Sequence, residues 1–425
     1  MKRAAHRCAT VALIRMNFKW LVIAVILVTL CKIALATLTY GTNDASMWES
    51  SASIIESRGG QAIYVNLVDV VDPHGRFVYR EIFNHPPFMV YFLAGLNKIQ
   101  KTTGIPVHVS LRLLDAFCDV GTILLTAGIL WHLLGVIPVM RMVLVATAPA
   151  WVFISGFHCN SDPLMLFLLI LAVYCIDVRG WKLAGICCFA LAAGIKMVPI
   201  ILAPALFLYF RTWRDRLLAV AIPAGFFALT ALPWLLTSPW ALFHRTLGYG
   251  SLTGRWGFGY LLPQIPLAGG LAARAFNSQG RNFLLLVLIG ASWLLNRGRR
   301  PVPLYYQFGL LFLLFFCLTP GFGIQYLAWL TPWIAIFPAA AIAGFTVAGG
   351  LYCAVVYTYW CNGLPWFYAN SLAAPHYPLV NALGNALGVI AWLSVLVLLA
   401  IWWNDYKRVL EKQPAEVTLS RAAAS

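Results

Sequence analysis

The chain has 425 residues, of which 61% are hydrophobic and 10% are charged, and its mean hydropathy is +0.80. So few charged side chains exclude a sizeable soluble domain, because a water-facing surface carries many more of them. The formal net charge of +16 does not indicate nucleic-acid binding, since the basic residues stand between apolar runs, where they set membrane topology and contact anionic lipids.

Apolar runs of about 17–25 residues, each long enough to cross a bilayer, recur from end to end. The first, about Phe18–Tyr40, has no convincing small-residue cleavage site and predicts a retained span rather than a signal peptide. Pro86–Leu96 is too short to cross and predicts an amphipathic helix along the interface. Further spans are predicted at about 107–134, 138–156, 162–178, 181–195, 197–210, 217–236, 282–296, 302–319, 322–338, 341–360 and 383–403. The number of spans stays open near 181–210 and 322–360.

The basic residues test this order of spans. More than half of the 30 lysines and arginines precede the first span, follow the last one, or lie in the short connectors predicted to be cytoplasmic. By the positive-inside rule, this distribution predicts about twelve spans in an inner (plasma) membrane, with both termini in the cytoplasm. The predicted fold class is therefore an all-α polytopic membrane protein. Residues 1–403 form a single transmembrane module with long outer loops at 41–106 and 237–281, and residues 404–425 form a cytoplasmic tail.

The first outer loop concentrates the scarce acids. The chain has 14 acidic residues, and six of them lie between 41 and 106. Asp44 directly follows the first span, where Asn43 or Asp44 could cap a short helix, and capping is compatible with a catalytic role. His85 precedes two prolines that form a rigid turn; it is either a capping or interfacial residue or a ligand of phosphate or sugar. The remaining acids of the loop are predicted to be solvated surface: Glu49, Glu56, Asp69, Asp72 and Glu81.

Other uncommon polar residues are predicted on the same outer side. Asp162 and Pro163 have the pattern of a helix N-cap followed by proline, whereas His158 and Asn160 are not needed for that cap and favour a site. Lys196 stands between two short apolar helices, so it either contacts an anion or extends to the outer headgroups.

Two further segments have open interpretations. Arg112, Asp115 and Asp119 share one face of the second span, which predicts an internal salt-bridge network or, alternatively, a part of the site. The glycine-rich stretch Tyr249–Tyr260 predicts a mobile outer lid that carries Arg255 and Trp256.

The predicted position of these residues on the outer side of the membrane limits which sugar donors the site can use. An outward site with no nucleotide-binding loop cannot use a cytosolic nucleotide-activated donor, so we expect a polyprenyl-phosphate sugar. Glycosyl transfer then needs a carboxylate that takes the proton of the acceptor hydroxyl, and cations or hydrogen-bond donors that stabilise the departing phosphate. Asp44 suits the base, and His85, Lys196 and Arg255 suit the phosphate. One base without a covalent nucleophile predicts inversion at the anomeric carbon.

The order of these motifs resembles the GT-C superfamily of membrane glycosyltransferases that use polyprenyl-phosphate sugars, and most of all its small mannosyl- or arabinosyltransferase-like members. The matching positions are Asp44, His85–Phe88, His158–Tyr174, Gly194–Pro199 and Pro320–Trp329. The resemblance implies a GT-C-like bundle in which Asp44 is the catalytic base. We expect substrate to be bound by Asn43, Arg80, His85, His158, Asn160, Asp162, Lys196, Arg255, Gln325 and Tyr326.

The chain differs from oligosaccharyltransferases, since it has neither a large soluble C-terminal domain nor a clear paired-acid metal motif. We therefore expect no cofactor and do not favour a divalent metal. The expected partners are the polyprenyl-phosphate-sugar donor, a lipid or glycan acceptor, and membrane lipids. Two other functions stay open: a transporter or flippase of a lipid-linked sugar, which predicts inverted repeats, and an O-antigen-ligase-like enzyme with a pyrophosphate-linked donor.

Overall fold

The computed structural model describes residues 2–248, 250–298, 302–372 and 378–422, with side chains between residues 18 and 405 of those ranges except Pro378. Tyr249, Arg299 and Arg300, which the sequence assigned to an outer lid and to an inner connector, lie outside the described residues. Most of the described chain is helical, because a helix satisfies its own backbone hydrogen bonds where no water is available.

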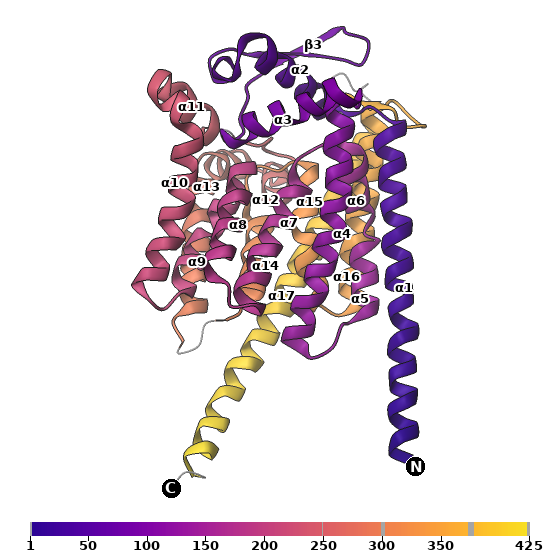
Figure 1. The fold of residues 1–425 in the computed structure, drawn as a ribbon, viewed down its shortest axis with the longest axis vertical. Helices are drawn as coiled ribbons and strands as arrows, with labels where there is room; N and C mark the ends of the chain where they lie inside the picture. Colours follow the sequence, from indigo (N-terminus) through magenta and orange to yellow (C-terminus); the bar gives the residue numbers. More distant parts are fainter. Residues whose placement is uncertain (1, 249, 299–301, 373–377, 423–425) are drawn as a thin grey trace.

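Long apolar helices form the frame of the bundle (Figure 1). Five described helices are long and apolar enough to cross a membrane: α1 (Lys2–Leu38), α4 (Val107–Leu134), α10 (Trp213–Thr237), α16 (Ala339–Trp360) and α17 (Pro378–Ala422). A sixth candidate is a pair bent by 42°: α5 (Val139–Ala146), followed by α6 (Pro149–Phe153) and the π-helical turn η2 (Ile154–His158). The chain is thus a multi-pass helical membrane protein.

Shorter helices fill the bundle. They are α7 (Asp162–Val173) with the π-helical η3 (Tyr174–Val178), α8 (Lys182–Ile195), the 3₁₀ helix η4 (Val198–Leu202) with α9 (Ala203–Tyr209), α14 (Leu304–Leu318), and η6 (Ile324–Tyr326) with α15 (Leu327–Leu330) and η7 (Thr331–Ile336). Every span expected from the sequence has a helical counterpart, but length and composition identify only five or six spans among the described residues. The count of about twelve therefore stays a prediction.

Residues 41–106, predicted as the first outer loop, fold into a small cap. Its elements are β1 (Gly41–Thr42), α2 (Asn43–Arg58), η1 (Gly60–Tyr64), β2 (Val68–Val71), β3 (Phe77–Glu81) and α3 (Phe88–Thr103). Figure 1 shows α2, α3 and β3 lying across one end of the bundle, whereas α1 enters and α17 leaves at the other end. Strand β1 pairs in parallel with β4 (Tyr368–Ala369), which ties the cap to the segment after α16.

Two outer segments differ from the expected boundaries. The helix predicted over Pro86–Leu96 begins at Phe88 and continues through polar residues to Thr103, where Gly104 ends it with a φ of 76°. The loop predicted at 237–281 is largely helical, with α11 (Pro239–Leu247), α12 (Gly257–Leu261), η5 (Leu262–Gln264) and a long α13 (Gly269–Asn296). The outer turns of α13 are rich in polar residues, which made them resemble a loop.

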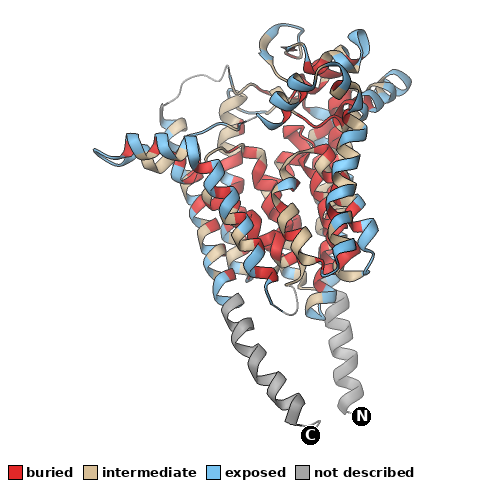
Figure 2. Ribbon diagram, turned by 90° about the vertical axis from the view of Figure 1, so that its left-hand side faces the viewer, coloured by how far each residue is buried: buried red, intermediate tan, exposed pale blue. Residues whose placement is uncertain are grey.

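Burial follows the pattern expected for a membrane bundle. Figure 2 shows buried residues concentrated inside the bundle and exposed residues on the outward sides of its helices. Large apolar side chains are among the exposed ones, for example Leu27, Leu229 and Trp293. Such side chains suit contact with lipid tails, so their exposure is consistent with a lipid-facing surface.

Candidate active site

The site begins where α1 ends and α2 starts. Gly41 has a φ of +107°, and a Cβ atom there would lie 2.8 Å from the carbonyl oxygen of Phe157, so only glycine allows this close approach. Thr42 is the N-cap of α2: its Oγ1 accepts the Asp44 N–H at 3.2 Å and donates to the carbonyl oxygen of His158 at 2.6 Å. Thr42, rather than Asn43 or Asp44, therefore caps the helix, which leaves the Asp44 carboxylate available for another role.

The two oxygens of the Asp44 carboxylate have different surroundings. Oδ2 accepts a hydrogen bond from Asn160 Nδ2 at 2.9 Å and lies 3.2 Å from His158 Nε2, while His158 Nδ1 lies 2.8 Å from the hydroxyl of Tyr357. Oδ1 has no hydrogen-bond partner among the described residues, and the Asp44 side chain is 26% exposed. One oxygen is thus held in place, and the other can accept a proton from outside.

Asp44 is ionised at neutral pH. Burial opposes its ionisation, but the charge and hydrogen bond of His158, with Lys196 and Asn160, outweigh burial and hold the Asp44 pKa below its ordinary value of 3.8. A carboxylate that stays deprotonated in this way is ready to act as a base.

Lys196 lies on the other side of Asn160. It follows the last residue of α8 in an extended conformation, and its Nζ donates to Asn160 Oδ1 at 3.2 Å. The same Nζ lies 5.7 Å from the centre of the Tyr326 ring and 5.4 Å from that of Trp329. Asn160 therefore connects Lys196 to Asp44, and the Lys196 side chain, only 15% exposed, does not extend to the headgroups.

Asp162 is the ion-pair partner of Lys196. Its Oδ1 pairs with Lys196, its side chain is completely buried, and its Oδ2 has no partner among the described residues. The expected capping role is wrong, because Ser161 occupies the N-cap position of α7 and makes no capping bond with its side chain. A buried carboxylate needs a cation nearby, so Asp162 holds Lys196 in place.

His85 is neutral and lies between aromatic rings and the chain just before Lys196. Its ring lies 4.5 Å from that of Trp48 and 5.5 Å from that of Phe83, and it hydrogen-bonds to the backbone of Ile195. Burial, together with the charge of Lys196, lowers the pKa of His85 to about 3. His85 thus supports the turn that carries Lys196. If the His85 ring contacts a phosphate, it does so as an uncharged group.

The remaining predicted site residues differ in their partners and in their exposure. Asn43 bonds the Tyr79 hydroxyl at 3.1 Å, and Tyr326 bonds Ser251 and stacks on Trp329 with centroids 3.9 Å apart. Gln325, half-buried, is the middle residue of η6. Arg80 and Arg255 are exposed.

The structure thus brings together Asp44, His158, Asn160, Asp162, Lys196 and Tyr326. Arg80 pairs with Asp69 across the hairpin, and Arg255 has no salt bridge among the described residues. Trp256, expected on a mobile lid, is buried and stacks on Phe322 at 4.0 Å.

Two positions that sequence reasoning missed belong to the site. Tyr357 orients His158, and Trp329 contacts Lys196. Both stand in apolar, aromatic-rich helices, where no sequence signal distinguishes them from packing residues. Among the described residues, no group of three or more His, Cys, Asp or Glu side chains is arranged to hold a metal ion.

Of the three residues in the predicted α4 network, Arg112 and Asp119 reach α1 or the residue after it, whereas Asp115 is buried and pairs with no cation among the described residues. Asp119 pairs at 2.5 Å with Lys32 of α1, and both side chains are buried. Arg112 donates to the carbonyl oxygens of Thr39 and His108. The network predicted on α4 is therefore a connection of Arg112 and Asp119 to α1 and Thr39, close to the start of the segment that carries Asp44.

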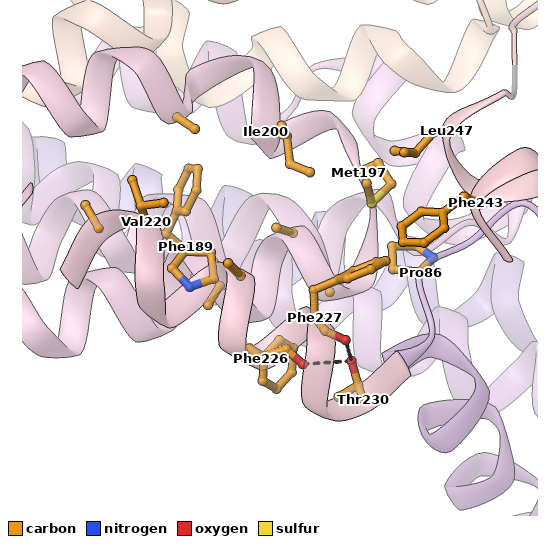
Figure 3. Close-up of a pocket in the computed structure, with 17 residues that line it drawn as sticks. Pro86, Phe189, Met197, Ile200, Val220, Phe226, Phe227, Thr230, Phe243 and Leu247 are labelled. Carbon is orange, nitrogen blue, oxygen red and sulfur yellow. Dashed lines mark hydrogen bonds between the residues drawn. The ribbon is translucent and has the colours of Figure 1, made fainter. Parts of the chain in front are cut away.

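An apolar groove adjoins Lys196. It has a volume of about 350 Å³, and its lining is apolar except for Thr230, whose hydroxyl bonds the backbone of α10. Figure 3 shows Pro86, Met197, Phe243 and Leu247 at one end of the groove and Phe189 and Val220 at the other. Pro86 and Met197 directly follow His85 and Lys196, so the groove begins next to the polar network.

Comparisons with known proteins find a matching family and similar chains. Residues 83–258 match glycosyltransferase family 87, a stretch that includes His85, His158, Asp162 and Lys196 but not Asp44. A curated relative, the mouse (Mus musculus) Dol-P-Man:Man(5)GlcNAc(2)-PP-Dol alpha-1,3-mannosyltransferase, is 32% identical over 93 residues. That match covers 21% of this chain and 21% of the relative, so the chain spans about a fifth of that protein's length.

Among solved structures, the chain is similar to ArnT from Cupriavidus metallidurans, crystallised with undecaprenyl phosphate. The sequence identity is 14% and the TM-score 0.47, over 89% of this chain and 75% of the other. The match to a glycosyltransferase family, together with the mannosyltransferase match, confirms the resemblance to membrane glycosyltransferases that the motifs indicated.

The ion pair between Lys196 and Asp162 yields a stability prediction. Lys196→Met leaves Asp162 buried without a cation, so we expect it to lower the free energy of unfolding by about 3–5 kcal/mol. Lys196→Met combined with Asp162→Asn removes both charges and should recover most of that loss. Thermal or denaturant unfolding in detergent measures both effects. A double variant as unstable as the single one would contradict the role given to Asp162.

Proposed function

We propose that the chain transfers a sugar from a polyprenyl-phosphate-linked donor to a hydroxyl of a lipid or glycan acceptor, with Asp44 as the general base and with inversion at the anomeric carbon. The observation that carries this proposal is the asymmetric binding of the Asp44 carboxylate. His158 and Asn160 hold Oδ2, which leaves Oδ1 open toward the acceptor hydroxyl.

The proposed step is a single displacement. The acceptor hydroxyl gives its proton to Asp44 Oδ1 while its oxygen bonds to the anomeric carbon. The bond between that carbon and the phosphate oxygen breaks, and its electron pair stays on the phosphate. Because Asp162, the other carboxylate of the network, is buried and paired with Lys196, it is not available as a covalent nucleophile, which supports inversion.

Lys196 is the proposed partner of the departing phosphate. It is a cation joined to the base through Asn160, with the ring of Tyr326 beside it. A preorganised cation stabilises the negative charge that develops on the leaving group. Arg255, exposed and without a salt bridge among the described residues, is the proposed second cation. These charges come from side chains, so the proposal requires no metal.

The apolar groove is the proposed binding site of the polyprenyl chain. Its volume of about 350 Å³ falls within the usual range of about 300–1,000 Å³ for ligand pockets. Alanines, glycine and aromatic rings form most of the wall, which suits a branched hydrocarbon. A chain in this groove would lead its phosphate to Lys196, since Met197 lines the mouth of the groove.

We also propose that the site faces the periplasm or cell exterior. The connectors at the opposite end of the bundle hold the basic clusters, which supports a cytoplasmic location for that end and for both termini.

The orientation is testable by labelling in intact cells. We expect His74→Cys, exposed in the cap, to react with a membrane-impermeant maleimide, in a background where all ten native cysteines are replaced by alanine. Arg214→Cys, exposed at the start of α10, is the opposite-side control and should react only after the membrane is permeabilised. The reverse pattern would place the site in the cytoplasm.

The base assignment is testable by sugar transfer. Asp44→Asn keeps the size and most hydrogen bonds of the side chain but removes its basicity, so we expect transfer to fall by about 10²–10⁴-fold. The assay measures radiolabelled sugar moved from a panel of polyprenyl-phosphate sugars by purified protein in liposomes.

The matched control for that assay is Glu56→Gln, which removes an exposed carboxylate from the same helix and should leave the rate unchanged. The thermal stability of each variant shows whether it is folded. A folded Asp44→Asn protein with the wild-type rate would refute the assignment.

A further inference from the structure

The hairpin of β2 and β3 presents two different faces. Tyr79 lies opposite Val70 and Glu81 opposite Val68, and both valines are fully buried. Arg80 lies opposite Asp69 and forms an exposed ion pair with it. Since side chains alternate along a strand, Tyr79 and Glu81 lie on the inner face of the hairpin, and Arg80 lies on the outer face.

The inner face adjoins the start of α2. The hydroxyl of Tyr79 accepts a hydrogen bond from Asn43, the residue before Asp44. Ser371 donates to Asn43 Oδ1 at 3.2 Å, and Ser46 donates to the hydroxyl of Tyr368 at 3.3 Å. Hydroxyl groups from three separate segments therefore surround the residues that carry the base.

Glu81 has no evident structural purpose on this face. It is half-buried, its carboxylate accepts the N–H of Ile82, and no lysine or arginine pairs with it among the described residues. Burial raises the pKa of Glu81; the Ile82 hydrogen bond opposes that shift, and the negative charge of Asp44 adds to it. A carboxylate that has no cation of its own and feels the negative charge of Asp44 costs stability, which points to a function.

We propose that Tyr79 and Glu81 form the acceptor subsite, and that the acceptor is a neutral, hydroxyl-rich sugar. The inference rests on the proposed function, because it takes Asp44 as the base. A carboxylate accepts hydrogen bonds from several hydroxyls, and the half-buried Tyr79 places an aromatic ring on the same face of the hairpin. An anionic acceptor is disfavoured, since it would meet both Asp44 and Glu81 with no cation on the inner face among the described residues.

The test compares two carboxylate variants of the same hairpin. Glu81→Gln removes the charge on the inner face, whereas Asp69→Asn, the matched control, removes one on the outer face. The probes are p-nitrophenyl hexosides and pentosides, each neutral or carrying a phosphate, with a polyprenyl-phosphate sugar as donor. We expect Glu81→Gln to raise the acceptor KM about tenfold or more, because a hydrogen bond to a charged group is lost. The donor KM should stay unchanged, and Asp69→Asn should behave as wild type.

An unchanged acceptor KM in Glu81→Gln, or a preference for the phosphorylated sugars, would overturn the subsite while leaving the proposed function intact. Calorimetric binding of the neutral sugars to wild type and Asp44→Asn separates the two proposals, because binding needs the subsite but not the base. Binding without transfer from any polyprenyl-phosphate donor would refute the proposed function and keep the subsite. Neither binding nor transfer would refute both.

Discussion

The site depends on one buried charge. Asp162, at the start of α7, has no exposed surface, and Lys196 is the cation that compensates for it. Once Lys196 is fixed, Asn160 lies between it and Asp44, and the proposed base and the proposed phosphate ligand become parts of one network. The spacing between the acceptor hydroxyl at Asp44 and the donor phosphate at Lys196 would therefore be set by side chains that stabilise each other.

The rest of the bundle keeps the first loop beside that network. Lys32 and Asp119 join α1 to α4 inside the protein, and Arg112 binds the carbonyl oxygen of Thr39 near the end of α1. Gly41 then lets the chain pass close to Phe157, and Thr42 joins the start of α2 to His158. Charges this deep in an apolar bundle are costly and are commonly retained for function. Here they place Asp44 next to residues more than a hundred positions away.

Much of this could be predicted from the sequence, for a physical reason. Polar groups are costly in an apolar chain, so Asp44, His158, Asn160, Asp162 and Lys196 stood out by their scarcity, and charge placed them at one end of the bundle. The parts that could not be predicted depend on tertiary packing. His85 is neutral because Trp48 and Phe83 bury it.

The face of the hairpin on which each side chain of β3 lies could not be predicted from the sequence either. Arg80 was expected at the site and Glu81 at the surface, yet the two are adjacent on β3 and the hairpin turns them to opposite faces. A difference of one residue reverses which side chain faces inward. Tyr357 and Trp329 could not be predicted as site residues for a different reason. In a chain with 17 tryptophans and 17 tyrosines, no sequence signal distinguishes the few that contact polar groups.

The central claim is that Lys196 and the apolar groove together bind one lipid-linked donor, with the Asp44 base left open beside it for the acceptor. A cryo-electron-microscopy structure of the protein with a polyprenyl phosphate tests it most directly. The account predicts the phosphate within hydrogen-bond distance of Lys196 Nζ, the chain in the groove between Phe189 and Leu247, and Asp44 Oδ1 still open beside the phosphate. A phosphate bound at the opposite end of the bundle, or a groove left empty by the bound lipid, would contradict it.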